Sequence, residues 1–142
     1  GVFLGRRMVE RLKRIYNVGT INYGELDITF HRDDFRRRTE MLVPSKTNLD
    51  FSIEGRNILL VDDVLYTGRT VRAGLDAMLD FGRPAHVELM VLIDRRFSRE
   101  LPVQPDYTGR VVDVVSDETV KVQWSENDME NKVILFSSTK KA

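Results

Sequence analysis

The sequence contains no cysteine, and only two of its 142 residues, His31 and His86, are histidines. The lack of cysteine excludes disulfide bonds, thiolate metal sites and thiol catalysis, and it is typical of an intracellular enzyme. The two histidines do not predict a metal site, because no carboxylates at a suitable spacing complete a coordination set.

An excess of charge of one sign and a long apolar run are missing as well. The chain has 22 basic and 22 acidic residues, so its total charge does not indicate nucleic-acid binding. No apolar run reaches about 18 residues and no signal-peptide pattern is present, so the expected compartment is the cytoplasm, without membrane insertion. The length predicts a single domain over residues 1–142 with one core.

The first third of the chain predicts a helix, a strand and a long loop. Apolar residues recur at helical spacing from Val2 to Tyr16, which indicates an amphipathic helix. Thr20 to Phe30 mixes β-branched and aromatic residues in partial alternation, which predicts a strand that changes face near Gly24. His31 to Ile53 shows no period, so we expect a long loop or a two-stranded flap there.

The middle of the chain predicts a strand, a helix and a second strand. Asn57 to Asp62 and His86 to Ile93 are nearly continuous apolar runs, as expected for strands buried on both faces of a parallel sheet. Between them, Arg69 to Phe81 is amphipathic and is followed by Gly82 and Pro84. This order predicts an α/β fold with a mainly parallel sheet flanked by helices. Shorter strands are expected over Val111–Val115, Val120–Trp124 and Lys132–Phe136.

Two adjacent carboxylates, Asp62 and Asp63, follow the first apolar run, and a small hydroxyl-rich turn, Tyr66 to Thr70, follows them. Ionised Asp side chains only accept hydrogen bonds, so a pair of them suits paired donors such as the vicinal hydroxyls of a ribose. The turn offers backbone N–H groups, two Thr hydroxyls and a Gly that can take positive φ, directly before a helix. The pattern therefore predicts a sugar-phosphate site, and a plain helix cap is less favoured because a cap needs only one acid.

This stretch resembles the phosphoribosyl-pyrophosphate (PRPP) motif of the type I phosphoribosyltransferases, which has a hydrophobic strand, Asp-Asp and a Thr-Gly-x-Thr turn. The resemblance implies the fold of that superfamily. It also implies that Asp62 and Asp63 hold the ribose 2′- and 3′-hydroxyls and that Mg²⁺, bound with PRPP, lies near them. The residues implied to bind PRPP or nucleotide are Asp62, Asp63, Val64, Leu65, Tyr66, Thr67, Gly68, Arg69 and Thr70.

A second loop, Asp94 to Pro102, resembles the corresponding loop of the PyrR family of pyrimidine-operon regulators, which are uracil phosphoribosyltransferases and RNA-binding attenuators. The resemblance is also carried by Gly24 to Thr29, Arg32-Asp33-Asp34, Val61 to Ala73 and Gly82-Arg83-Pro84. It implies conversion of uracil and PRPP to UMP and pyrophosphate, and a homo-oligomer of two or more copies. Asp94, Arg95 and Arg99 are implied on the side of the base.

The chain departs from the PyrR pattern in two places. Arg95-Arg96-Phe97-Ser98 stands where the family usually has a shorter Arg-Gly-His. The family also normally carries a helix, a core strand and a second anion loop, which holds the pyrophosphate, ahead of the position of Gly1. We therefore expect the chain to be truncated at its N-terminus relative to the family, with Gly1 as the last residue of that second loop.

The segment from His31 to Leu49 resembles the hood that closes over PRPP in such enzymes. A closing hood has a chemical purpose, because the reacting sugar and the leaving pyrophosphate must be kept from water. We expect Arg32 to contact the pyrophosphate, as a guanidinium matches phosphate oxygens. The basic run Arg36-Arg37-Arg38 is interpreted either as a solvated face or as a pyrophosphate or RNA contact.

Two other functions remain open from the sequence. One is an RNA-binding attenuation regulator with little catalysis, which would bind a pyrimidine-operon mRNA leader in a UMP-dependent manner. The basic residues that could form a positive face are Arg6, Arg7, Arg11, Lys13, Arg14, Arg96, Arg99 and Arg110. The other is a purine-type phosphoribosyltransferase, against which the loop after Asp94 argues.

Overall fold

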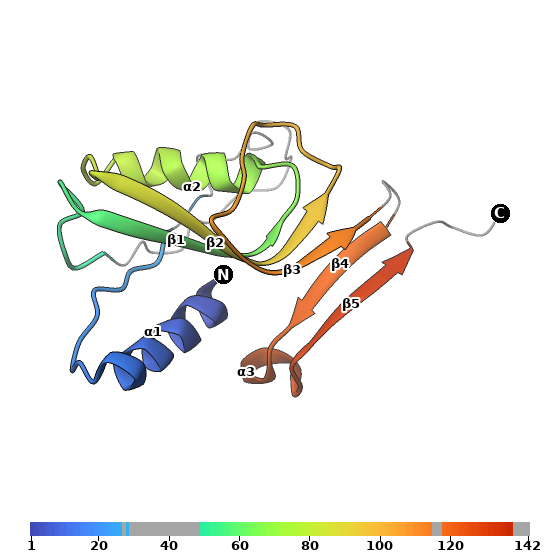
Figure 1. Ribbon diagram of the computed structural model, residues 1–142, viewed down its shortest axis with the longest axis horizontal. Coiled ribbons are helices and arrows are strands. Elements are labelled where there is room, and N and C mark those ends of the chain that lie inside the picture. Colours follow the sequence, from blue (N-terminus) through green and yellow to red (C-terminus); the bar gives the residue numbers. More distant parts are fainter. Residues whose placement is uncertain (27, 29–48, 115–117, 138–142) are drawn as a thin grey trace, which may run out of the picture.

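The computed structural model of the chain describes residues 1–26, 28, 49–114 and 118–137 (Figure 1). The described residues form two sheets, a parallel three-stranded sheet and an antiparallel hairpin. Within this part of the chain, no helix is long and apolar enough to span a membrane. The elements in chain order are α1 (Val2–Tyr16), β1 (Asn57–Leu65), α2 (Arg69–Leu79), β2 (His86–Arg96), β3 (Tyr107–Asp113), β4 (Glu118–Gln123), α3 (Ser125–Asp128) and β5 (Lys132–Ser137).

The parallel sheet has the order β1-β2-β3, and α2 is the crossover between its first two strands. The register aligns Asn57 with His86 at one end and Leu65 with Asp94 at the other. Figure 1 shows α2 on one side of this sheet and α1 on the other. The predicted α/β arrangement, with helices flanking a parallel sheet, is therefore confirmed.

The core lies between the parallel sheet and α2. Apolar side chains of β1, α2 and β2 meet there because α2 presents one apolar stripe to the sheet. Burial of each such side chain stabilises the fold by roughly 1.5–3 kcal/mol relative to leaving it exposed. The fully or nearly fully buried members of the cluster are Leu65, Val71, Leu89 and Val91, and Leu60, Leu75 and Val103 pack against them.

β1 is longer and less buried than the sequence predicts. It runs on to Leu65, because Val64 and Leu65 continue the pairing with β2, so both Asp62 and Asp63 lie inside the strand rather than after it. The expected burial on both faces was wrong for most of β1, and the side chain of Leu59 is 39% exposed. β2 likewise extends past Ile93 to Arg96.

The strand predicted over Thr20 to Phe30 was wrong for residues 20–26, where Glu25 is a single bridge residue in an otherwise irregular segment. Alternating side chains do not make a strand unless a neighbour pairs with the backbone. Residues 27, 29 and 30 lie outside the described part of the chain, as does most of the predicted loop over His31 to Ile53.

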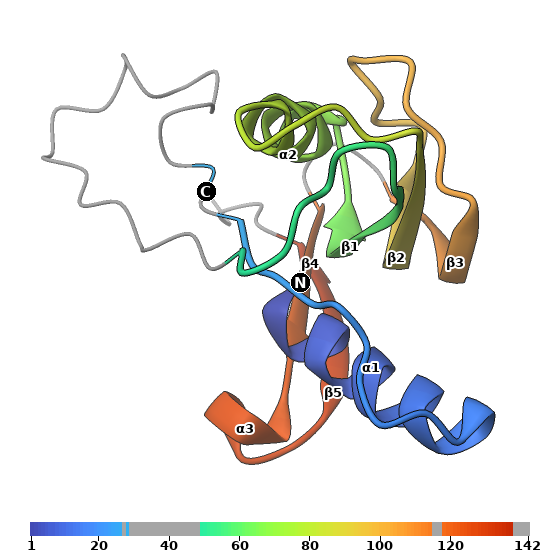
Figure 2. The ribbon, with the colours of Figure 1, turned by 90° about the vertical axis from the view of Figure 1, so that its left-hand side faces the viewer.

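The hairpin of β4 and β5 is joined by α3 and lies on the same side of the parallel sheet as α1, opposite α2 (Figure 2). The predicted strands over Val120–Trp124 and Lys132–Phe136 correspond to it within two residues. The strand predicted over Val111–Val115 begins four residues earlier, at Tyr107, because Tyr107 to Arg110 already pair with β2.

Candidate functional site

The acid pair lies near the carboxyl end of β1, at the point where α1 begins. The side chains of Asp62 and Asp63 are 20% and 35% exposed, and the Gly1 nitrogen lies 3.9 and 4.0 Å from an oxygen of each. Two backbone N–H groups, those of Asp63 and Val64, donate to the carboxylates of Asp62 and Asp63 over 2.8 Å each. The remaining carboxylate oxygens are acceptors for an incoming donor or cation.

The environment of Asp62 favours its protonated form. Burial is the first cause, and the negative charge and hydrogen bonding of Asp63 add to it, so that the pKa of Asp62 rises from 3.8 to about 7. A carboxylate that is costly to keep ionised gains from any ligand that brings hydroxyl donors or a cation.

The turn after β1, Tyr66 to Thr70, which we call the phosphate loop, leads directly into α2. Gly68 is the N-cap of α2 and takes φ of 97°, a left-handed conformation that favours glycine. The hydroxyl of Thr67 accepts from the Arg69 N–H over 3.2 Å, which folds the loop on itself. The next N–H groups of the helix have no intrahelical partner and carry the positive end of the helix dipole, as an anion site requires.

Two cavities adjoin the acid pair. The smaller has a volume of about 60 Å³ and is lined by the phosphate loop, by the end of β1 and by Asp62. The larger, of about 510 Å³, lies between α1, β1 and α2 and is lined mainly by apolar side chains. It reaches the acid pair only at its edge, through Gly1, Asp62 and Thr70. A phosphate needs N–H and hydroxyl donors, so the smaller cavity is the candidate site.

The residues predicted on the base side lie at the end of β2 and beyond it, and they contact protein groups. Asp94 and Arg95 are buried, with 8% and 6% of their surface exposed. The Arg95 guanidinium stacks 3.8 Å from the ring centre of Tyr66 and donates to the Glu118 carbonyl oxygen over 2.8 Å. Arg99 and Asp94 form an ion pair at 2.5 Å.

The segment Phe97 to Val103, which we call the base-side loop, lies directly against the phosphate loop. The backbone N–H groups of Glu100 and Leu101 both donate to the Thr67 carbonyl oxygen, over 2.9 and 3.1 Å. The Arg69 guanidinium pairs with the Glu100 carboxylate at 2.7 Å. The loops that follow β1 and β2 are thus in contact at the carboxyl ends of these two strands.

The structure places most of the predicted site residues in one region. Asp62 to Thr70 form the acid pair and the phosphate loop, and Asp94, Arg95 and Arg99 lie next to that loop. Arg32 and most of the predicted hood lie outside the described residues. Their assignment to the pyrophosphate stays a prediction.

Sequence reasoning missed the backbone donors of the base-side loop and the pairing of Arg69 with Glu100. The loop carries no glycine-rich or hydroxyl-rich signal of its own, so its role is visible only in the packed structure. Phe97 takes φ of 69°, and the glycine that the PyrR pattern usually has in this region would adopt that conformation readily.

Comparison with known proteins places the chain in a family. Residues 1–128 match the model of the phosphoribosyl transferase domain. A protein of Brevibacillus brevis named bifunctional protein PyrR is 48% identical over 129 residues, which cover 91% of this chain and 71% of that protein. A protein of the same name from Elusimicrobium minutum is 44% identical over 136 residues, which cover 96% and 75%.

A solved structure of a hypoxanthine-guanine phosphoribosyltransferase from Bacillus anthracis is similar at a TM-score of 0.47 and 22% identity, covering 61% of this chain and 52% of that one. The PyrR relatives match more than 90% of the chain at 44% and 48% identity, and this does not favour the purine-type alternative. The chain therefore belongs to the phosphoribosyl transferase domain family, and within that family to the PyrR proteins.

Proposed function

We propose that the chain transfers the 5-phosphoribosyl group of PRPP to uracil and releases pyrophosphate. The observation that carries this proposal is the juxtaposition of Asp62 and Asp63 with the phosphate loop at the carboxyl end of one parallel strand. In open α/β sheets, ligands bind in the crevice outside the carboxyl ends of the strands. The PyrR relatives support the choice of a pyrimidine base, as does the sequence resemblance of the loop after Asp94 to the PyrR family.

The two parts of the site have separate roles in this proposal. The carboxylates of Asp62 and Asp63 accept hydrogen bonds from the ribose hydroxyls and so orient the sugar ring. The phosphate loop binds the 5′-phosphate with its N–H groups and with the hydroxyls of Thr67 and Thr70. Both contacts fix the anomeric carbon relative to the base, and such positioning lowers the barrier to displacement.

Divalent magnesium fits the donor set of this site. Asp62 and Asp63 are two adjacent carboxylates, and Mg²⁺ is usually held by one or two carboxylates together with substrate phosphates. The described residues offer no cluster of three or more acidic or histidine side chains that would hold the ion by themselves. When bound, the ion would neutralise charge on the leaving pyrophosphate.

The acid pair also suits the charge that develops during transfer. The ribose ring becomes oxocarbenium-like as its bond to pyrophosphate breaks, and nearby carboxylates stabilise positive charge on the ring. The reaction on this reading depends on positioning and electrostatics more than on a general base. Arg32, which lies outside the described residues, is proposed to contact the departing pyrophosphate.

Pyrophosphate release tests the proposed function. The full-length protein is incubated with PRPP, Mg²⁺ and one base at a time, and released pyrophosphate is measured. We expect release with uracil and much less with hypoxanthine or guanine. Release with the purines and none with uracil would contradict the substrate assignment. Absence of release with every base would contradict the enzymatic function.

A second function, binding to the leader of a pyrimidine-operon mRNA under control of UMP, has its own support. The relatives carry the name bifunctional. In α1, Arg6, Arg7 and Lys13 pair with acidic side chains. Arg11 and Arg14 are exposed and have no ion-pair partner among residues 1–26, 28, 49–114 and 118–137. Unpaired guanidinium groups on one helix are suited to phosphate contacts.

Salt-dependent RNA binding distinguishes the two functions. We expect a leader RNA to bind more tightly when UMP is present, and affinity to fall as salt is raised. Equal retention of unrelated RNAs would contradict the regulatory function and leave the enzymatic proposal intact. A dimer or larger assembly, proposed from the PyrR resemblance, is checked in the same samples by analytical ultracentrifugation.

A further inference from the structure

Arg99 makes an unusual number of contacts for a residue predicted to face a substrate base. Its guanidinium donates to the carbonyl oxygens of Val103 and Tyr66, over 2.8 Å each, and to that of Arg95 over 3.3 Å. A further N–H group donates to the Asp94 carboxylate over 2.5 Å. Four of the five N–H groups of a guanidinium are thus used within the protein. The side chain is 23% exposed.

These contacts join the base-side loop to the phosphate loop. Arg99 holds the Tyr66 carbonyl oxygen, and the N–H groups of Glu100 and Leu101 hold the next carbonyl oxygen, that of Thr67. Gly68 also packs against the base-side loop, because a Cβ atom built there would lie 3.2 Å from Leu101 Cβ and 3.3 Å from Val103 Cγ2. Three successive residues of the phosphate loop are therefore in contact with the base-side loop.

The direction of the two bound carbonyl groups determines the direction of two N–H groups. In a planar trans peptide the C=O of one residue and the N–H of the next point in opposite directions. The carbonyl groups of Tyr66 and Thr67 point to the base-side loop, so the N–H groups of Thr67 and Gly68 point away from it. The cavity of about 60 Å³ is lined by the phosphate loop and by none of the residues of the base-side loop.

We propose that Arg99 is a positioning residue for the 5′-phosphate: by holding the Tyr66 carbonyl oxygen and Asp94, it keeps the N–H groups of the phosphate loop turned toward the small cavity. This inference rests on the proposed function and refines it. A contact of Arg99 with the base is not required, because its guanidinium already satisfies Asp94 and three carbonyl oxygens. Without Arg99, the Tyr66 peptide can rotate and present a carbonyl oxygen to the phosphate, which repels it.

The inference predicts that loss of Arg99 changes the KM for PRPP much more than the KM for uracil. The Arg99→Met variant keeps the length of the side chain but loses every donor, and we expect its KM for PRPP to rise at least about 10-fold. Its KM for uracil should change by less than about 2-fold, because the base is not the partner of Arg99 in this arrangement. The Arg99→Lys variant keeps the ion pair with Asp94 and should recover part of the loss.

Arg96→Met is the matched control. Arg96 is the last residue of β2, three residues before Arg99, and within the described residues its contacts are with Asp113 and Phe97 and not with the phosphate loop. Its removal changes the net charge by the same amount, so an electrostatic effect of charge alone would appear in both variants. We expect the KM for PRPP of Arg96→Met to remain within about 2-fold of the natural chain.

A binding measurement separates failure of this inference from failure of the proposed function. Ribose 5-phosphate is titrated into the natural chain, Arg99→Met, Arg99→Lys and Arg96→Met by calorimetry, which needs no turnover. We expect clearly weaker binding in Arg99→Met, a smaller loss in Arg99→Lys and no loss in Arg96→Met. If the natural chain binds ribose 5-phosphate more tightly than Arg99→Met does but shows no pyrophosphate release, the proposed transfer is wrong and the role of Arg99 stands.

Three results would overturn the role of Arg99. The first is unchanged PRPP and ribose 5-phosphate affinity in a folded Arg99→Met variant. The second is an equal rise in the KM values for PRPP and uracil, which indicates a general structural role. The third is loss of cooperative thermal unfolding in both Arg99→Met and Arg99→Lys, which would likewise assign the residue to the stability of the fold.

Discussion

The parallel sheet and the C-terminal hairpin differ in how their apolar side chains are covered. Leu65 of β1 is 1% exposed, whereas Leu135 and Val133 of β5 are 48% and 43% exposed. Among the described residues, α1 and α2 lie on opposite faces of the parallel sheet, whereas α1 meets the hairpin through Arg7 (Figures 1 and 2). The better covered half is also the half that holds the acid pair and the phosphate loop.

This difference in burial indicates which contacts hold the candidate site rigid. A two-stranded sheet is marginally stable by itself, so the hairpin depends on its contacts with the rest of the chain. The phosphate loop, in contrast, is fixed by the core beneath it and by the base-side loop beside it. Substitutions in the parallel sheet or the phosphate loop should therefore alter catalysis or global stability, and substitutions in the hairpin should have small, local effects.

The largest expected effect is on catalysis, from the acid pair. Asp62→Asn and Asp63→Asn keep the shape of each side chain but remove its charge, so we expect kcat/KM for PRPP to fall at least about 100-fold in each. Thermal unfolding should remain cooperative, because no basic side chain among the described residues forms an ion pair with either carboxylate. If both variants fail to fold, the pair is a structural cap and the sugar-phosphate interpretation is wrong.

The pH dependence of stability gives a second test of the acid pair, through the titration of Asp62. The pKa of Asp62 is about 7 in the folded chain and 3.8 in the reference state, so the folded state binds an extra proton between these values. Protonated Asp62 makes its full contribution to the free energy of unfolding below pH 3.8. As the pH rises toward 7, this contribution falls by up to about 1.4 kcal/mol per pH unit, and above pH 7 it is lost. We expect Asp62→Asn to remove this slope in urea unfolding measured from pH 4 to pH 8.

Activity should have the opposite pH dependence to stability. An ionised Asp62 is the better acceptor for ribose hydroxyls and for a cation, so kcat/KM for PRPP should rise through about pH 7 and then level. The residual activity of Asp62→Asn should lack this limb. Identical profiles for the natural chain and the variant would show that Asp62 does not titrate in the working range.

A pair of matched leucine substitutions tests the difference in burial directly. Leu65→Ala removes a buried side chain from the core, and we expect the free energy of unfolding to fall by about 3 kcal/mol. Leu135→Ala removes a half-exposed one and should cost less than about 0.5 kcal/mol. Urea unfolding measures both. A large cost for Leu135→Ala that grows with protein concentration would show that a second copy covers the hairpin.

Much of the fold and of the candidate site could be predicted from the sequence, because the relevant signals are local. The apolar runs of β1 and β2, the helical spacing in α1 and α2, and the Asp62-Asp63 pair before a Gly-containing turn each specify a short stretch. The length of β1 could not be predicted in the same way. Asp62 and Asp63 are poor strand formers by propensity, and only pairing with β2 keeps them in the sheet.

Contacts between residues that are distant in the sequence could not be predicted either, because they also depend on tertiary packing and not on a local signal. Nothing local distinguishes Arg99, which joins two loops, from Arg96, which pairs with Asp113 on the next strand. Thr20 to Glu25 alternates like a strand but finds one bridge position, because strand formation requires a partner edge. Arg32 and the predicted hood lie outside the described residues, so their assignment rests on the sequence alone.

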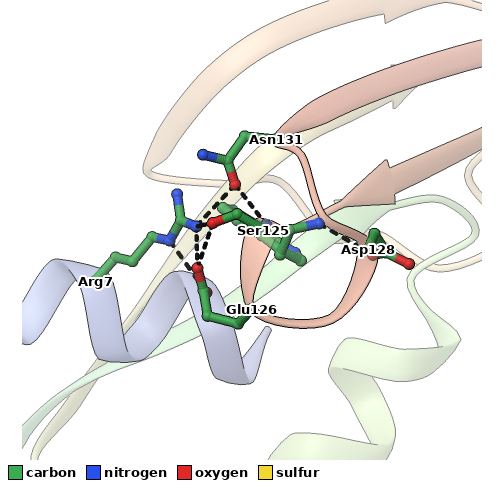
Figure 3. Close-up of polar contacts among 6 residues, drawn as sticks. Arg7, Ser125, Glu126, Asp128 and Asn131 are labelled. Carbon is green, nitrogen blue, oxygen red and sulfur yellow. Dashed lines mark hydrogen bonds and ion pairs between the residues drawn. The ribbon is translucent and has the colours of Figure 1, made fainter.

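The smallest expected effect comes from the contact that holds the hairpin to α1 (Figure 3). The Arg7 guanidinium pairs with Glu126, donates to Ser125 Oγ over 3.1 Å and to Asn131 Oδ1 over 2.8 Å, and lies 4.8 Å from the ring centre of Trp124. These groups are partly exposed, so solvent weakens the ion pair and the stacked ring is the better probe of the contact.

Because Trp124 is the only tryptophan of the chain, its fluorescence reports on this contact alone. In Arg7→Met we expect a shift of Trp124 emission and faster hydrogen exchange in β4 and β5, with exchange in β1 and β2 unchanged. Lys13→Met is the matched control, because Lys13 lies on the same helix and, within the described part of the chain, its ion pair is with Glu10 of that helix. If Arg7→Met also raised the KM for PRPP, the hairpin would contribute to the site through α1, whose first residue lies beside Asp62 and Asp63. The two halves of the molecule would then be mechanically coupled rather than independent.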